Sequence, residues 1–109
     1  MRYKLIIGSP DDEKVIQEII EAATNAGAGK IGNYSRCAVI DKIKATWIPE
    51  KGASPDDGEV GKITVTNCVW IETECTDKNI KEVYNAVKKI HPYEDPGMQI
   101  VRLEEIDLL

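Results

Sequence analysis

Residues 62–75 have the sequence KITVTNCVWIETEC, and this stretch decides the fold. Ile63, Val65, Val69 and Ile71 alternate with mostly polar residues, which is the two-residue period of a β-strand with one buried face. A strand of this length is about twice the usual five to six residues. We therefore predict a long strand here, paired with a second long strand over residues 35–48 across the Gly- and Pro-rich loop 49–61.

The remaining elements lie on either side of this hairpin. Residues 2–8 alternate like a strand, and residues 10–26 predict a helix capped by Ser9 with Pro10 in its first position. Thr76 and Asp77 predict the start of a second helix over 77–90, followed by a strand over 97–103 and an acidic, apolar tail over 104–109. The order βαββαβ predicts an α+β, ferredoxin-like fold: one four-stranded antiparallel sheet with both helices on one face, in a single domain of residues 1–109.

A sheet covered by helices on one face only leaves its other face to water or to a partner. We expect this open face to carry Trp70, Cys68, Ile40 and Ile48, and long strands that extend past a small sheet favour pairing with another copy. The chain is therefore expected to be a homo-oligomer, with Trp47, Cys68 and Trp70 at interfaces.

Composition excludes several function classes. The chain has 109 residues, with 14 Lys and Arg against 19 Asp and Glu, so its net charge is −5. An acidic chain without a basic cluster is poorly suited to binding nucleic acid. No apolar run approaches the roughly 20 residues that span a bilayer, and the N-terminus does not resemble a signal peptide. Three cysteines without paired spacing favour reduced thiols, so we expect a cytoplasmic protein that binds neither nucleic acid nor membrane.

Two segments stand out as motifs. Residues 27–32 match the G-x-G-x-x-G pattern, but a helix precedes them and a strand follows, so the pattern favours a helix end and a tight turn over a dinucleotide site. Residues 91–96, His-Pro-Tyr-Glu-Asp-Pro, contain the single histidine of the chain. His91 and Glu94 could ligate a divalent cation, especially with ligands from a neighbouring subunit, although a turn locked by two prolines explains the segment too.

Three segments in the same order carry a family resemblance: residues 29–37 (GKIGNYSRC), residues 52–62 and residues 91–96. Together they resemble the small domain inserted into bacterial members of the NGG-interacting-factor-three (Nif-three-like, or GTP cyclohydrolase I type 2) family. The last segment also resembles CutA, the divalent-cation tolerance protein. The resemblance implies a stand-alone version of that insert, with the ferredoxin-like fold and frequent trimers of CutA and PII proteins. In full-length family members the dinuclear metal site lies in the larger domain, so a hydrolase activity is not implied.

We therefore expect a non-enzymatic, oligomeric module, most simply a trimer, that binds a small ligand or a divalent metal ion in clefts between subunits. Arg36 would pair with an anionic group, Tyr34 and Tyr93 would contact the ligand, and His91 with Glu94 would ligate a cation. No catalytic residue is predicted. One alternative is a protein-interaction domain that docks on a separately encoded partner, and another is a weak metal-dependent hydrolase at a subunit interface.

Overall fold

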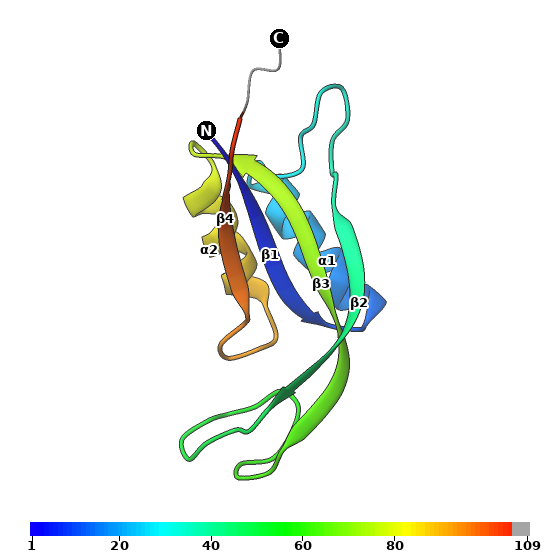
Figure 1. Cartoon of the computed structure of the whole chain (residues 1–109), viewed down its shortest axis with the longest axis vertical. Helices are drawn as coiled ribbons and strands as arrows, with labels where there is room; N and C mark the ends of the chain where they lie inside the picture. Colours follow the sequence, from blue (N-terminus) through cyan, green and yellow to red (C-terminus); the bar gives the residue numbers. More distant parts are fainter. Residues whose placement is uncertain (106–109) are drawn as a thin grey trace.

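A computed structural model describes residues 1–105, so the last four residues of the predicted tail, 106–109, lie outside the described residues. The elements follow the predicted order, as Figure 1 shows. Their bounds are β1 (Arg2–Pro10), α1 (Glu13–Asn25), β2 (Val39–Trp47), β3 (Thr64–Thr76), α2 (Ile80–Ile90) and β4 (Met98–Leu103). No helix in this part of the chain is long and apolar enough to cross a membrane.

The four strands form one sheet in the order β2-β3-β1-β4, and all neighbours are antiparallel. Both helices lie behind the sheet in the view of Figure 1, on the same face. This arrangement confirms the predicted ferredoxin-like architecture. It also leaves β2 and β4 as the two edge strands, so each has one side without a partner strand within the described chain.

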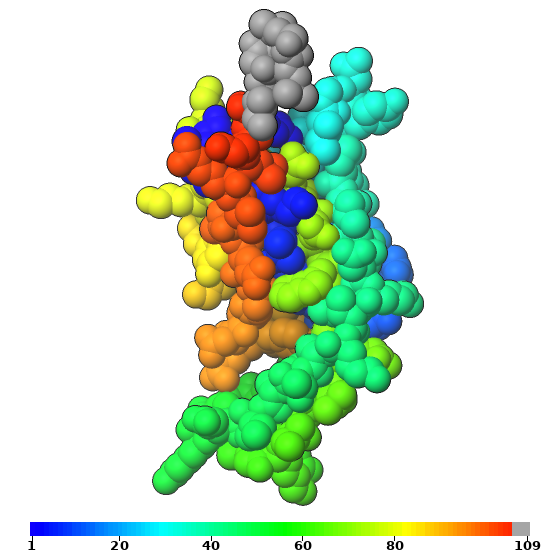
Figure 2. Space-filling view, viewed as in Figure 1, coloured from blue at the N-terminus to red at the C-terminus, as the bar shows by residue number. Residues whose placement is uncertain are grey.

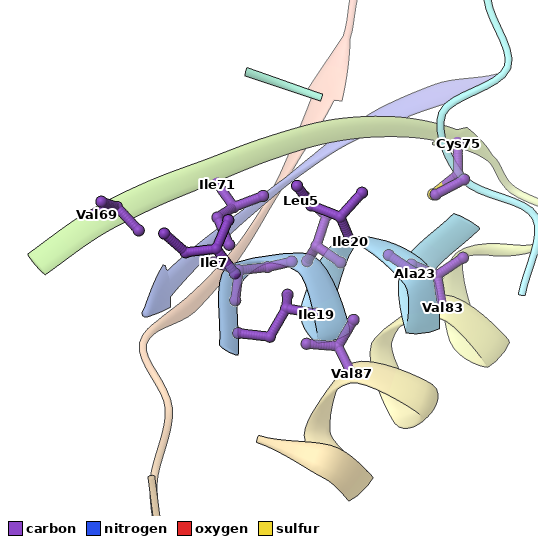
Figure 3. Close-up of a cluster of buried hydrophobic side chains, with 12 residues drawn as sticks. Leu5, Ile7, Ile19, Ile20, Ala23, Val69, Ile71, Cys75, Val83 and Val87 are labelled. Carbon is purple, nitrogen blue, oxygen red and sulfur yellow. The ribbon is translucent and has the colours of Figure 1, made fainter. Parts of the chain in front are cut away.

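The core lies between the helices and alternate residues of the two central strands (Figure 3). Leu5 and Ile7 of β1 and Val69 and Ile71 of β3 are almost fully buried, as the two-residue period predicts. The helices contribute buried side chains at helical spacing, which gives each helix one apolar stripe. These are Ile16, Ile19, Ile20, Ala23, Val83 and Val87.

Both predicted helix starts are wrong by about three residues. Ser9 does not cap α1, because β1 continues through Ser9 and Pro10, which pair with Val69 and Cys68 of β3. The cap is Asp12, whose carboxylate accepts hydrogen bonds from the backbone N–H groups of Lys14 and Val15 at 3.0 and 3.2 Å. Similarly, α2 begins only at Ile80: β3 extends through Thr76, residues 77–79 form a turn, and the N-cap residue is Asn79 instead of Thr76 or Asp77.

The register of the sheet corrects one predicted face. Trp70 and Cys68 lie on the open face, because their neighbours Val69 and Ile71 point into the core. Ile40, however, is opposite Ile71, so it belongs to the helix side of the sheet. Ile48 lies beyond the end of β2, in the segment of residues 48–63 that we call the arm. The arm projects past the body of the domain in Figure 1.

Candidate functional site

The sole histidine of the chain is buried where α2 ends. His91 is the C-terminal cap residue of α2, and its extended backbone directs the chain toward β4. Its Nε2 lies 2.6 Å from the carbonyl oxygen of Gly8 in β1, and its Nδ1 accepts a hydrogen bond from the backbone N–H of Tyr93 at 3.0 Å. His91 therefore joins the α2–β4 loop (residues 91–97) to the end of β1.

These two contacts define the protonation state of the ring. Since Nδ1 accepts a hydrogen bond from the backbone N–H of Tyr93, it carries no proton itself, so the ring proton must be on Nε2, which donates to the carbonyl of Gly8. Burial lowers the pKa of His91 below its usual value of 6.5, and the bond to Gly8 and the charge of Asp56 oppose this shift only in part. The neutral imidazole therefore acts as a two-sided backbone connector.

Tyr93 places an aromatic ring between His91 and the base of the arm. Its ring centroid lies 5.0 Å from that of His91 and 6.3 Å from that of Trp47, the last residue of β2. Burial, together with the nearby Cys68, Asp56 and Asp57, raises the pKa of Tyr93 to about 12. The phenol therefore remains protonated, and it serves as a packing group with a hydroxyl donor.

Glu94 ties the arm to the α2–β4 loop. Its Oε2 accepts a hydrogen bond from the backbone N–H of Ser54, in the arm, at 2.9 Å. In Figure 2 the α2–β4 loop (orange) lies directly above the arm (green). The three side chains of the His-Pro-Tyr-Glu motif thus hold three separate segments together: β1, the end of β2 and the arm.

A divalent cation does not fit this site within one copy. Both ring nitrogens of His91 and one oxygen of Glu94 already make hydrogen bonds to the backbone. Among residues 1–105, no three side chains of His, Cys, Asp or Glu come together as a metal-binding group. A cation at His91 and Glu94 needs a second copy to complete its ligands and must displace Tyr93 from Nδ1, so this role stays a prediction.

Tyr34 and Arg36 lie at the other end of the molecule, in the connection between α1 and β2 (Figure 1). Tyr34 is 74% exposed and pairs with Ile31 in a small hairpin through two backbone hydrogen bonds of 2.9 Å. Arg36 adopts a left-handed backbone conformation (φ 59°), and its guanidinium donates to Gln17 of α1 at 2.6 Å. One copy of the chain therefore does not bring these two residues together with His91, Tyr93 and Glu94.

Replacing Gly29 with alanine is expected to lower the free energy of unfolding by about 2 kcal/mol. Gly29 has φ +82°, and an added Cβ would lie 2.9 Å from the backbone nitrogen of Cys37. Gly32 provides the control, because its φ is +56° but nothing lies within 4 Å of an added Cβ. Urea denaturation should show a smaller loss for Gly32→Ala. Equal losses for the two variants would mean that the close approach to Cys37 does not constrain the loop.

The predicted interface residues occupy different environments. Trp70 is half-buried, with its indole over the backbone of Gly8 and Gly97, where glycine leaves room for the ring. Cys68 is buried, and burial raises the pKa of its thiol. Trp47 lies at the arm against Tyr93. Sequence reasoning missed the role of Gly8 and Gly97, and the available signal was a glycine at the last position of one predicted strand and at the first position of another.

Comparison with known proteins identifies relatives of this chain. No protein-family model matches it. It is 37% identical over 101 residues to a GTP cyclohydrolase 1 type 2 homolog of Halalkalibacterium halodurans, covering 93% of this chain and 27% of that protein. The homolog of Bacillus subtilis is 40% identical over 93 residues, covering 84% of this chain and 25% of that protein. The chain is homologous to one segment of NIF3-family proteins.

Solved structures agree with this NIF3-family relationship. The chain matches a Bacillus cereus protein related to NIF3 with a TM-score of 0.80 and 28% identity, over 95% of this chain and 26% of that protein. The CutA1 divalent cation tolerance protein of Thermus thermophilus matches with a TM-score of 0.68 and 17% identity, over 98% and 88% of the two chains. The second match shows the shared fold alone. The chain spans about a quarter of the length of the curated NIF3-family relatives it matches.

Proposed function

We propose that this NIF3-family segment is a non-enzymatic, oligomeric regulatory module that holds a small ligand or a divalent cation between its copies. The observation that supports this most is the uncovered face of the sheet. Both helices pack on the opposite face, while Trp70, Val39 and Val101 lie on the open face. Burying the apolar part of this face against a second copy is favourable at roughly 25 cal/mol per Å².

The open face is also divided in a way that suits specific assembly. Toward the chain termini it carries the ion pairs Arg2–Glu74 and Lys4–Glu72, at 2.9 and 3.1 Å. Toward the arm it carries Trp70 over Gly8 and Gly97. An apolar centre beside paired charges is the composition of many protein interfaces. We propose a trimer, in the cytoplasm, where the three free thiols stay reduced.

The ligand site of this proposal lies around the His-Pro-Tyr-Glu segment at a boundary between copies. If the ligand is a cation, Glu94 supplies a carboxylate and His91 supplies Nδ1 once Tyr93 is displaced. If it is a small organic anion, Arg36 from another copy supplies the guanidinium. Either ligand fills the space between copies, and no residue of the chain is required to act as an acid, base or nucleophile.

Titration calorimetry with Cu²⁺, Zn²⁺ and Ni²⁺ tests the cation version. We expect binding by the wild-type chain and at least about a tenfold weaker affinity for Glu94→Gln, which keeps an oxygen for Ser54 but removes the charge. The matched control is Glu82→Gln, an exposed acid in the first turn of α2. Equal affinities for the wild type, Glu94→Gln and His91→Ala would exclude this site as the cation site.

Docking on a separate protein is the second candidate, and the arm is the observation that favours it. Ile48, Val60 and Ile63 are exposed there, beyond the body of the domain. An exposed apolar projection of this kind is suited to insertion against a partner. A monomeric chain in solution that captures a partner, and that loses this capture when Ile63 is replaced by lysine, would favour this candidate over the oligomeric module.

A further inference from the structure

The two ends of the molecule carry opposite charge. Residues 29–37, which we call the tip loop, contain Lys30 and Arg36 and no acidic residue. The arm contains four acidic residues and two lysines, and one of these lysines, Lys62, is paired with Glu59 at 2.8 Å. Glu94 and Asp95 of the α2–β4 loop add negative charge beside the arm. The cation-rich end and the acidic end lie at opposite ends of the molecule in Figure 1.

The tip loop presents apolar side chains on a fixed backbone. Ile31 is 44% exposed and Tyr34 is 74% exposed, although both are held in a two-residue hairpin. The base of the loop is bonded to the sheet, since the N–H of Gly29 donates to the backbone carbonyl of Glu74 in β3 at 2.8 Å, and it is closed by the N–H of Cys37, which donates to the carbonyl of Gly29 at 2.9 Å. A preorganised loop loses little conformational entropy when it binds, which makes it an effective docking element.

The acidic end offers a matching surface. Ile63 is 72% exposed and Val60 is half-exposed, and both lie close in sequence to Asp56 and Asp57. The arm that carries them is held in place by the bond between Ser54 and Glu94 and by the packing of Trp47 on Tyr93. Each end therefore combines exposed apolar side chains with unbalanced charge, and the signs of the two charges are opposite.

We propose that the tip loop of one copy docks onto the arm of a neighbouring copy, with Ile31 and Tyr34 against Ile63 and Lys30 and Arg36 toward Asp56 and Asp57. The molecule is 54 Å along its longest axis, so one chain cannot bring its own two ends together. A head-to-tail contact of this kind closes into a ring when the rotation between copies allows it. The inference rests on the proposed function, because it assumes that copies assemble.

This contact has a consequence for the ligand site. It brings Tyr34 and Arg36 of one copy to the end of the next copy that holds His91, Tyr93 and Glu94. The five candidate residues, which lie at two ends of a single chain, then border one cleft between copies. Arg36 exchanges its exposed hydrogen bond with Gln17 for contacts with the neighbouring copy. The site is therefore complete only in the assembly.

Charge exchange tests the contact. The tip variant carries Lys30→Glu and Arg36→Glu, the arm variant carries Asp56→Lys and Asp57→Lys, and the exchanged variant carries all four changes. We expect the tip and arm variants each to weaken self-association by about tenfold or more, since like charges then face each other. The exchanged variant should regain association to within about threefold of wild type. Sedimentation equilibrium measures association, and circular dichroism confirms that each variant is folded.

The control variant reverses two lysines elsewhere, Lys81→Glu and Lys88→Glu, which are exposed on α2. This variant changes the net charge as much as the tip variant does. It should associate like wild type, which would show that the weaker association of the tip variant is not caused by net charge alone. If wild type assembles and the tip and arm variants assemble equally well, the docking contact is wrong and the proposed function stands. Failure of the exchanged variant to recover also overturns the contact. A wild-type chain that stays monomeric overturns both proposals.

Discussion

His91→Ala is expected to lower the free energy of unfolding by about 3 kcal/mol. The substitution removes two part-buried hydrogen bonds and leaves the carbonyl of Gly8 and the N–H of Tyr93 without the partner that His91 supplies. Unsatisfied buried backbone groups cost about 1–3 kcal/mol each, which is more than the net gain of a typical hydrogen bond. Urea denaturation measures the loss. A loss below about 0.5 kcal/mol would show that His91 does not hold the α2–β4 loop to β1.

The pH dependence of the free energy of unfolding distinguishes hydrogen bonding by the neutral His91 ring from simple packing of its side chain. Burial lowers the pKa of His91 in the folded chain, so the unfolded chain binds the proton more readily. The stability that His91 contributes is therefore fully present above its unfolded pKa of about 6.5 and is lost as the pH falls toward the folded pKa. The difference in stability between wild type and His91→Ala should narrow from about pH 7 to about pH 5.

His91→Gln keeps a donor for Gly8 and should show a smaller loss of stability than His91→Ala. Because glutamine does not titrate, its stability difference from His91→Ala should stay constant over this pH range.

Trp70→Lys is expected to weaken self-association by about 100-fold or more, because tryptophans in the centre of an interface are frequent hot spots. A lysine at this position places a cation on a face that is buried between copies, where its desolvation is unfavourable. The indole also packs on Gly8 and Gly97, so the substitution can lower the stability of the fold itself. The thermal stability of the variant must therefore be measured together with its self-association. Trp70→Phe keeps an apolar ring there and should retain most of the association.

A second pair of variants keeps this test independent of the packing of Trp70. Val101 on the open face and Ile90 on α2 are almost equally exposed, at 42% and 43%. Val101→Lys should weaken association, whereas Ile90→Lys should not, because Ile90 belongs to the helix layer. Weaker association of Ile90→Lys alone would place the interface on the helices. Equal association of the two variants would mean that the open face is not the interface.

Local patterns were sufficient to predict the order and packing of the elements. From Val69 onward the alternation over β3 reflects which face is buried, as do the apolar stripes of the helices. Ile63 and Val65 follow the same alternation but are 72% and 60% exposed, because no helix covers that end of the hairpin. The helix starts were less accurate, because Ser9-Pro10-Asp11 suits a strand end as well as a helix cap. The choice is made by the pairing of Ser9 and Pro10 with β3, more than 50 residues away along the chain.

The candidate site could be predicted only in part. The residues 91–96 stood out by composition, and the structure places His91, Tyr93 and Glu94 at one junction. Their partners could not be predicted, since Gly8 is 83 residues from His91 and Ser54 is 40 residues from Glu94. Tyr34 and Arg36 were predicted to share a site with His91, Tyr93 and Glu94 because residues 29–37 and 91–96 are both unusual turns. That similarity does not indicate how far apart the two turns lie in the fold.

The mass of the wild-type chain in solution tests the central claim most directly. The claim is that copies of this chain assemble through the open sheet face into an oligomeric binding module. Sedimentation equilibrium should give a mass of about three times the 12.1 kDa of one chain, in keeping with the proposed trimer. A mass of 12.1 kDa over the whole accessible concentration range would contradict the account.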